Sequence, residues 1–276
     1  MNRAWRLIPL YIGVVIILLY TLFPLYILFL LAFTPAAYTT IDVHSGSYPT
    51  LYPAGFTLYN LQAAFGIPEI MTALIKSLET AFLVGGLALL IGIPAAYGLS
   101  RLKPKIASLI STTLFFANML PSVTIAIPIS ATFLRLGLNE TFLGLALAQE
   151  LIVLPLTVFM LLGAFQSLPR EIVSQARVDG AGLMTTIYTV IVPLAKAGVA
   201  AAFLLSWMMS WDEFTFAVFL SPAQPTLPIL IYEYVTRGYI LEAAAFSMIV
   251  TIPVVVLVIF MAKFLKGELL AGGLNG

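Results

Sequence analysis

The chain has 276 residues, of which 61% are hydrophobic and only 9% are charged, and its formal net charge at pH 7 is +1. A soluble domain usually carries about 25% charged residues, so this composition excludes an ordinary water-soluble globule and favours a lipid bilayer as the solvent. The near-neutral charge offers no basic field for nucleic acid, and a chain without Cys has neither disulfides nor thiolate metal sites. The one His, His44, stands in a polar loop, so we expect no metal site.

Six apolar segments are long enough to cross a bilayer, whose core of about 30 Å takes about 20 helical residues. The first follows Arg3 and Arg6 and runs to Phe33, far beyond the apolar core of about 7–15 residues in a signal peptide, so we expect a retained span. We therefore predict an all-α integral membrane fold in which residues 1–276 form one transmembrane domain. The predicted spans are approximately residues 7–33, 71–98, 107–131, 141–163, 197–220 and 242–265.

The basic residues predict the orientation of these spans. With the N-terminus inside, only Lys76, Arg135 and Arg237 of the 13 Lys and Arg residues fall on the outer side. This asymmetry follows the positive-inside rule, so we predict that both termini are cytoplasmic. The outer segment 34–70 is long, and its part from 56 to 65 predicts a short surface helix.

The cytoplasmic segment 164–196, between the predicted fourth and fifth spans, is longer than a compact bundle needs, and long loops are often functional. Pro169 suits the first turn of a helix, and Gly180 suits the left-handed turn that ends it. Leu183, Ile187 and Ile191 then follow at helical spacing, and Pro193 should stop or kink this second helix. The segment therefore predicts a helix, a Gly turn and a second helix at the cytoplasmic surface.

This segment resembles the coupling loop of ABC importer permeases, whose signature is Glu-Ala-Ala, three residues, Gly, nine residues, Ile, one residue and Leu-Pro. Ala176, Gly180 and Pro193 fall on that spacing, with Val190 and Val192 in place of Ile and Leu. Ser174 and Gln175 replace the family's Glu-Ala. The resemblance implies that the loop docks into a cleft on an ATP-hydrolysing subunit. The residues implied in that contact are Glu171, Ser174, Gln175, Ala176, Asp179, Gly180, Ala181, Val190, Val192 and Pro193.

Four further segments resemble the carbohydrate-uptake permeases of the maltose and trehalose type. They are residues 56–60, 95–102, 211–214 and 269–276. The resemblance implies a second homologous permease, a cytoplasmic ATPase dimer that binds ATP and Mg, and an external solute-binding protein. It places the chain in the cell membrane of a bacterium or archaeon. The chain has no Gly-x-x-x-x-Gly-Lys-Ser/Thr motif to hold ATP phosphates, so we expect a transport subunit without enzymatic activity or a cofactor of its own.

Acidic residues within predicted spans cost about 2.5–3.5 kcal/mol at the bilayer centre, so each needs a reason to be there. We expect them to face the bundle interior and to line a translocation path, with aromatic side chains as stacking surfaces for sugar rings. The alternative is that they form hydrogen bonds between helices and an interfacial aromatic belt. The residues concerned are Glu79, Glu150, Asp212 and Glu213, with the aromatic residues Trp207, Trp211, Phe214 and Phe216.

The outer segment 221–241 is rich in Pro at its start, which makes it stiff. By the same resemblance it should reach toward the binding protein. The residues implied are Gln224, Pro225, Thr226, Leu227 and Pro228.

The most economical hypothesis is therefore a sugar-importer permease. An ABC permease for a polyol, a glycerol phosphate or another solute is the first alternative. A permease with a strong anion site would require Arg or Lys residues deep in the spans. A secondary transporter driven by protons through Glu79 and Glu150 is the second alternative, and it leaves the 166–193 loop unexplained.

Overall fold

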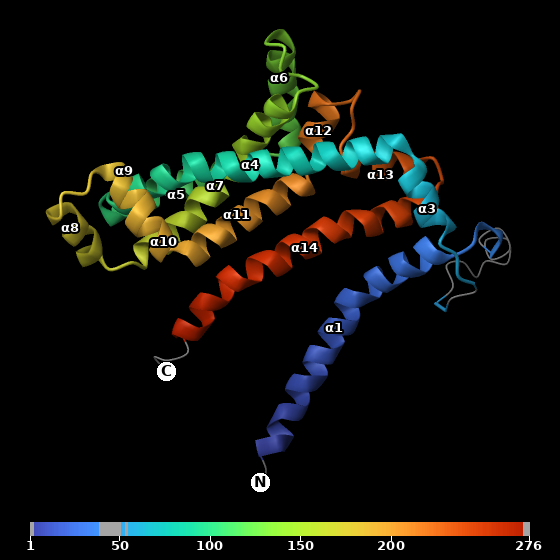
Figure 1. Cartoon of the computed structure of the whole chain (residues 1–276), viewed down its shortest axis with the longest axis horizontal. Helices are drawn as coiled ribbons and strands as arrows, with labels where there is room; N and C mark the ends of the chain where they lie inside the picture. The colour runs from blue at the N-terminus through green and yellow to red at the C-terminus, as the bar shows by residue number, and fades with distance from the viewer. Residues whose placement is uncertain (1–2, 39–50, 53–54, 273–276) are drawn as a thin grey trace. The chain divides into compact units, whose positions relative to one another are not determined.

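A computed structural model describes residues 3–38, 51–52 and 55–272 of the chain (Figure 1). Within these residues every regular element is a helix and no strand occurs, which confirms the predicted all-α fold class. His44 and the end of the Gly-rich tail, residues 273–276, lie outside the described residues.

Four of the described helices are long and apolar enough to cross a membrane. They are α1 (Arg3–Phe33), α4 (Pro68–Ser100), α7 (Phe142–Gln166) and α14 (Ile240–Gly272). They coincide with the predicted first, second, fourth and sixth spans. A fifth candidate is a bent pair in which residues 183–194 meet α11 (Lys196–Trp211) at 88°.

The other two predicted spans are not continuous helices, so those predictions are wrong in detail. Residues 107–131 belong to α5 (Pro104–Ala117) and α6 (Ser122–Arg135), which are separated at residues 118–121. Pro121 stands directly before α6, where its missing N–H and the steric restriction on Leu120 end the preceding helix. Residues 197–220 are likewise divided between α11 and α12 (Thr215–Leu220).

The chain divides into two compact units, one made of Met1–Met71 and Leu230–Ile252 and the other of Thr72–Ile229 and Pro253–Gly276. In the second unit α7 is the central helix and packs against α5, α6, α11 and α12. Small residues let α7 and α11 lie close together, because a Cβ on Gly198 of α11 would lie only 2.3 Å from the Cβ of Ala164 in α7. Figure 1 shows α6 and α12 near the start of α7, and α8 (Arg170–Val178) beyond its end.

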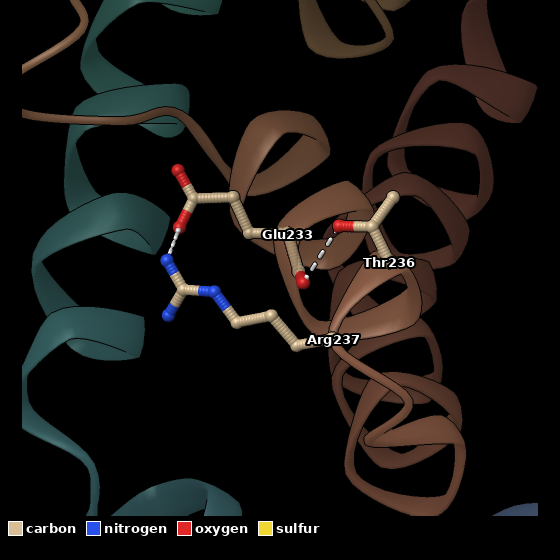
Figure 2. Close-up of polar contacts among 3 residues, drawn as sticks. All are labelled: Glu233, Thr236 and Arg237. Atoms are coloured by element: carbon tan, nitrogen blue, oxygen red, sulfur yellow. Dashed lines mark hydrogen bonds and ion pairs between the residues drawn. The ribbon is translucent and has the colours of Figure 1, made fainter.

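The first unit contains α1, the short helix α3 (Tyr59–Gly66) and most of α13 (Leu227–Thr236). The α3 helix confirms the surface helix predicted at 56–65. The buried Asn60 side chain donates to the carbonyl oxygens of Ala32 and Thr34, each at 3.0 Å, and so fixes α3 to the end of α1. At the end of α13, Arg237 pairs with Glu233 at 3.1 Å, and Thr236 donates to the Glu233 carbonyl (Figure 2).

Candidate functional site

The helix α8 ends in a motif made entirely of backbone. The Ala181 N–H donates to the Ala176 carbonyl at 2.9 Å, and the Gly180 N–H donates to the Arg177 carbonyl at 3.1 Å. Gly180 has φ +84°, so this is a Schellman end with Gly in the left-handed position, as the sequence predicted. A Cβ on Gly180 would meet no atom of this chain within 4 Å, so backbone conformation, rather than space, demands Gly here.

One side of α8 is anchored by apolar packing. Val173 is 5% exposed and belongs to a buried cluster with Phe165 of α7 and with Ile187 and Ile191 of the following segment. These contacts hold α8 through its apolar side. The helix is therefore fixed from beneath while its other side stays open.

The open side of α8 is a continuous face. Its residues follow helical spacing and line one open hollow. They are Glu171, Ser174, Gln175, Val178 and Asp179. Val178, 88% exposed, places an apolar side chain among these polar ones, which suits a surface that another protein covers.

The second arm runs from Leu183 to Leu194 and bends sharply into α11. It comprises α9 (Leu183–Thr185), a π-helical turn η1 (Thr186–Ile191) and α10 (Val192–Leu194). The 88° bend at Ala195 confirms that the Pro193 region ends this arm. The π-helical turn was not predicted, because hydropathy spacing does not distinguish it from an α-helix; such turns often mark functional positions.

The predicted coupling residues therefore fall into two groups. Glu171, Ser174, Gln175 and Asp179 share the open face of α8. Val190 and Val192 are half-buried on the second arm, and Val192 packs against the Val173 cluster. The helix α8 is therefore joined to α11 through packed side chains and a sharp bend.

The predicted translocation-path residues do not form one site in this chain. The Glu213 carboxylate accepts bonds from the N–H groups of Phe216 at 2.8 Å and Ala217 at 3.2 Å, and so caps α12. Gln149 donates to Glu213 at 3.4 Å and accepts from Ser210 at 2.5 Å. Glu213 thus caps α12 and connects it to Gln149 of α7, which is the helix-to-helix alternative.

The aromatic residues are also committed to packing. Trp207 and Trp211 stack with ring centroids 4.9 Å apart, and Trp207 meets Phe82 of α4 edge-on at 5.8 Å. Trp207, Trp211 and Phe216 are buried, whereas Phe214 is half-buried. The buried rings offer no open face to a sugar in this conformation.

In this chain the acidic residues Glu150 and Glu213 are buried, whereas Glu79 and Asp212 are exposed. Glu79 lies on a side of α4 that also exposes Ile75, and Phe82 is partly exposed there although it contacts Phe203 and Trp207 of α11. Glu150 is 6% exposed, and neither of its carboxylate oxygens has a hydrogen-bond partner among the described residues.

The family with the description "Binding-protein-dependent transport system inner membrane component" matches residues 88–268, which include α7, α8, the bend and α11. The chain belongs to this family. The permease is 31% identical to the inner membrane ABC transporter permease protein YcjP of Escherichia coli (strain K12), over 100% of this chain and 99% of that protein. It is 32% identical to the sulfoquinovosyl glycerol transport system permease protein SmoH of Agrobacterium fabrum (strain C58), over 96% and 93% of the two chains.

A solved structure shares the fold of the permease. It is a bacterial ABC transporter involved in the import of the acidic polysaccharide alginate, which matches with a TM-score of 0.73 and 20% identity over 96% of this chain and 98% of that one. The permease is therefore a multi-pass membrane subunit of a binding-protein-dependent importer, which confirms the family resemblance. Its relatives are transport subunits rather than enzymes.

The outer loop of the permease is less available than the sequence suggested. Gln224 is exposed, but Thr226 is 4% exposed and Leu227 is 1% exposed. The Leu227 N–H donates to Ser77 of α4 at 2.9 Å, which holds this part of the loop against the helix. Thr226 and Leu227 are thus buried in this conformation, whereas Gln224 remains exposed.

Within residues 3–38, 51–52 and 55–272, no three His, Asp or Glu side chains come together as a metal site. The residues that sequence reasoning missed are Gln149, which donates to Glu213, Ser210, which donates to Gln149, and Val173, the anchor of α8. The signal for Val173 was its place on the apolar side of a helix whose opposite side is polar.

Proposed function

We propose that the permease couples ATP hydrolysis in a cytoplasmic ATPase dimer to solute uptake through residues 169–193. The observation that carries this proposal is the open face of α8 on a helix anchored from beneath by Val173. A rigid helix whose polar side chains line an open face fits a contact with a cleft on a partner, because little ordering entropy is lost on docking. ATP and Mg would bind to that partner and not to this chain.

Six spans with both termini in the cytoplasm fit this role. Four long helices cross as single elements, and we assign the other two crossings to α5 with α6 and to α11 with α12. Broken helices are tolerated at membrane depth where neighbouring helices satisfy the backbone. The predicted cytoplasmic segments of this topology hold all but three of the 13 basic residues, which supports this orientation.

A second homologous permease completes the path. The exposed face of α4 carries Ile75 and Phe82 with Glu79 between them, and a carboxylate at this depth would be costly in lipid. Covering this face with a second permease removes that cost and places Glu79 at the boundary between the two subunits. Asp212, also exposed, could accept hydrogen bonds from the same solute.

The solute we propose is a neutral sugar, delivered by an external binding protein in a bacterium or archaeon. Carboxylates accept hydrogen bonds from sugar hydroxyls, and SmoH is named for a sugar-containing solute. An anionic solute is disfavoured because the Lys76 ammonium, which lies within α4, is buried and already donates to Ser221 and Gln224. A polyol fits the same groups, and a sugar panel with the binding protein separates the two.

One observation favours the second candidate function, a proton-driven transporter. Glu150 is buried, and neither carboxylate oxygen has a partner in the part of the chain that the structure describes, as a proton carrier would be. Uptake into proteoliposomes distinguishes the candidates. We expect transport that needs ATP and persists when the proton gradient is collapsed, and Glu150→Gln should retain it.

The coupling proposal is tested at Gly180 with a control in the same loop. Gly180→Val forces a side chain into φ +84°, which costs roughly 1–2 kcal/mol for a non-Gly residue, so the Schellman end should distort. Gly182 also has open space around its Cβ position but an ordinary φ of −65°, so Gly182→Val should be tolerated. Gly180→Asn should recover part of the function, because Asn accepts the left-handed conformation.

The measurements are copurification of the ATPase and solute-stimulated ATP hydrolysis, with membrane insertion of the permease as the check on folding. Gly180→Val should lose docking or stimulation while inserting normally. Full copurification and normal transport by Gly180→Val would show that this loop is not the coupling element.

A further inference from the structure

A polar network near the start of α7 joins three parts of the second unit. Lys76 of α4 is 2% exposed, and its ammonium donates to the Ser221 hydroxyl and, at 2.7 Å, to the Gln224 carbonyl. Ser221, itself fully buried, donates in turn to the Glu140 carboxylate at 3.2 Å. A cation from α4 and an anion from the turn before α7 are thus bridged by one hydroxyl of the outer loop.

Glu140 is held in an uncommon conformation by this network. Its φ is +62°, in the left-handed region that non-Gly residues rarely occupy and that persists only where surrounding contacts impose it. Those contacts are the bond from its own N–H to the Leu220 carbonyl at 2.8 Å and the bond that its carboxylate accepts from the Ala223 N–H at 2.9 Å. The turn before α7 and the outer loop therefore fix each other.

The network leaves a short exposed tip. Pro222, Ala223 and Gln224 are exposed, whereas Ser221 before them and Thr226 after them are buried. The tip's backbone is held at the Ala223 N–H and at the Gln224 carbonyl, yet its side chains face solvent. A segment whose backbone is already ordered loses little entropy when a partner contacts its side chains.

We infer that Lys76, Ser221 and Glu140 are positioning residues that shape the 222–224 tip for contact with the solute-binding protein. This rests on the proposed function, which places this end of the permease outside the cell. The partner follows from the family, which depends on a binding protein, and from the tip's location, since α8 occupies the opposite end of α7.

The experiment measures ATP hydrolysis by the whole importer, reconstituted in nanodiscs, as its own purified, solute-loaded binding protein is titrated. Glu140→Gly removes the carboxylate but suits a positive φ, so the turn should keep its shape and the complex should assemble. Ser221→Ala removes only the bridging hydroxyl. In both variants we expect the half-saturating concentration of binding protein to rise about tenfold, because the tip loses its preorganisation. The maximal stimulated rate should stay within about twofold.

Arg237→Gln is the matched control, because it removes an outer-side cation whose ion pair with Glu233 is exposed and lies outside the network (Figure 2). It should leave the titration unchanged; an equal shift would mean that general outer charge, and not the network, sets docking. A lowered maximal rate at unchanged half-saturation in Glu140→Gly overturns the inference and leaves the proposed function intact. If the unsubstituted importer is not stimulated at all, the proposed function fails and this inference with it.

Discussion

The two ends of α7 carry segments that use their polar residues in opposite ways. At the end that leads into α8, apolar packing by Val173 and a backbone motif at Gly180 hold the segment, and its polar side chains line an open face. At the other end, Lys76, Ser221 and Glu140 bond to one another and to the loop backbone. The first segment offers a whole helix face to a partner, whereas the second offers only a tip of three residues.

The difference shows that a loop's position in the chain does not say how much of it a partner can reach. Both segments were assigned partner contacts from sequence resemblance. The open face of α8 is available as expected, but Thr226 and Leu227 of the outer loop are buried. What decides availability is whether packing or polar side chains hold the backbone in place.

The largest effect should come from breaking the apolar anchor of α8. Val173→Asp buries a polar group without a hydrogen-bond partner, which costs about 2–7 kcal/mol, so α8 should detach and ATPase coupling should be lost. Val178→Asp places the same residue at a position that is 88% exposed and should leave α8 folded. Limited proteolysis of the 166–182 segment checks this, and equal protection in the two variants would contradict the anchor.

The next effect should appear at the cap of α12. Glu213→Ala leaves the N–H groups of Phe216 and Ala217 and the Gln149 amide without their acceptor, which costs about 1–3 kcal/mol for a buried group left unsatisfied. Asp212→Ala, at the exposed neighbour, should not lower stability. Thermal unfolding in detergent distinguishes the variants, and an unchanged midpoint for Glu213→Ala would reopen a substrate role for that carboxylate.

A smaller effect, of the opposite sign, is expected in the outer loop. The Thr226 hydroxyl is buried and has no hydrogen-bond partner among the described residues, so Thr226→Val should stabilise the permease by about 1 kcal/mol. Because the side chain is buried, stimulation by the binding protein should not change. A weaker response to the binding protein would show that Thr226 becomes exposed during transport.

The smallest effect should come from the exposed ion pair of α13. Arg237 and Glu233 are four residues apart on the surface, and such pairs contribute about 0–1 kcal/mol (Figure 2). Arg237→Gln should therefore leave the unfolding midpoint nearly unchanged, in contrast to the buried network at Glu140. A large loss of stability would mean that this pair is shielded from solvent in the assembled importer.

The sequence by itself determined the features that depend on composition and local backbone preference. Hydropathy located four of the six predicted spans as continuous helices, and Gly180 predicted a left-handed helix end because Gly accepts that conformation without steric cost. Pro193 predicted the end of the second arm, since Pro lacks an N–H. The coupling spacing identified the family before any fold was known.

Only the tertiary structure decided which polar and aromatic residues are free to act. Glu213 caps α12 and bonds to Gln149, which is 64 residues away, and Lys76 reaches the Gln224 carbonyl across 148 residues. Trp207 and Trp211 are buried against each other, while Glu79 is exposed. The physical reason is that burial and hydrogen-bond satisfaction depend on neighbours brought together by helix packing, and no local pattern in the sequence encodes those neighbours.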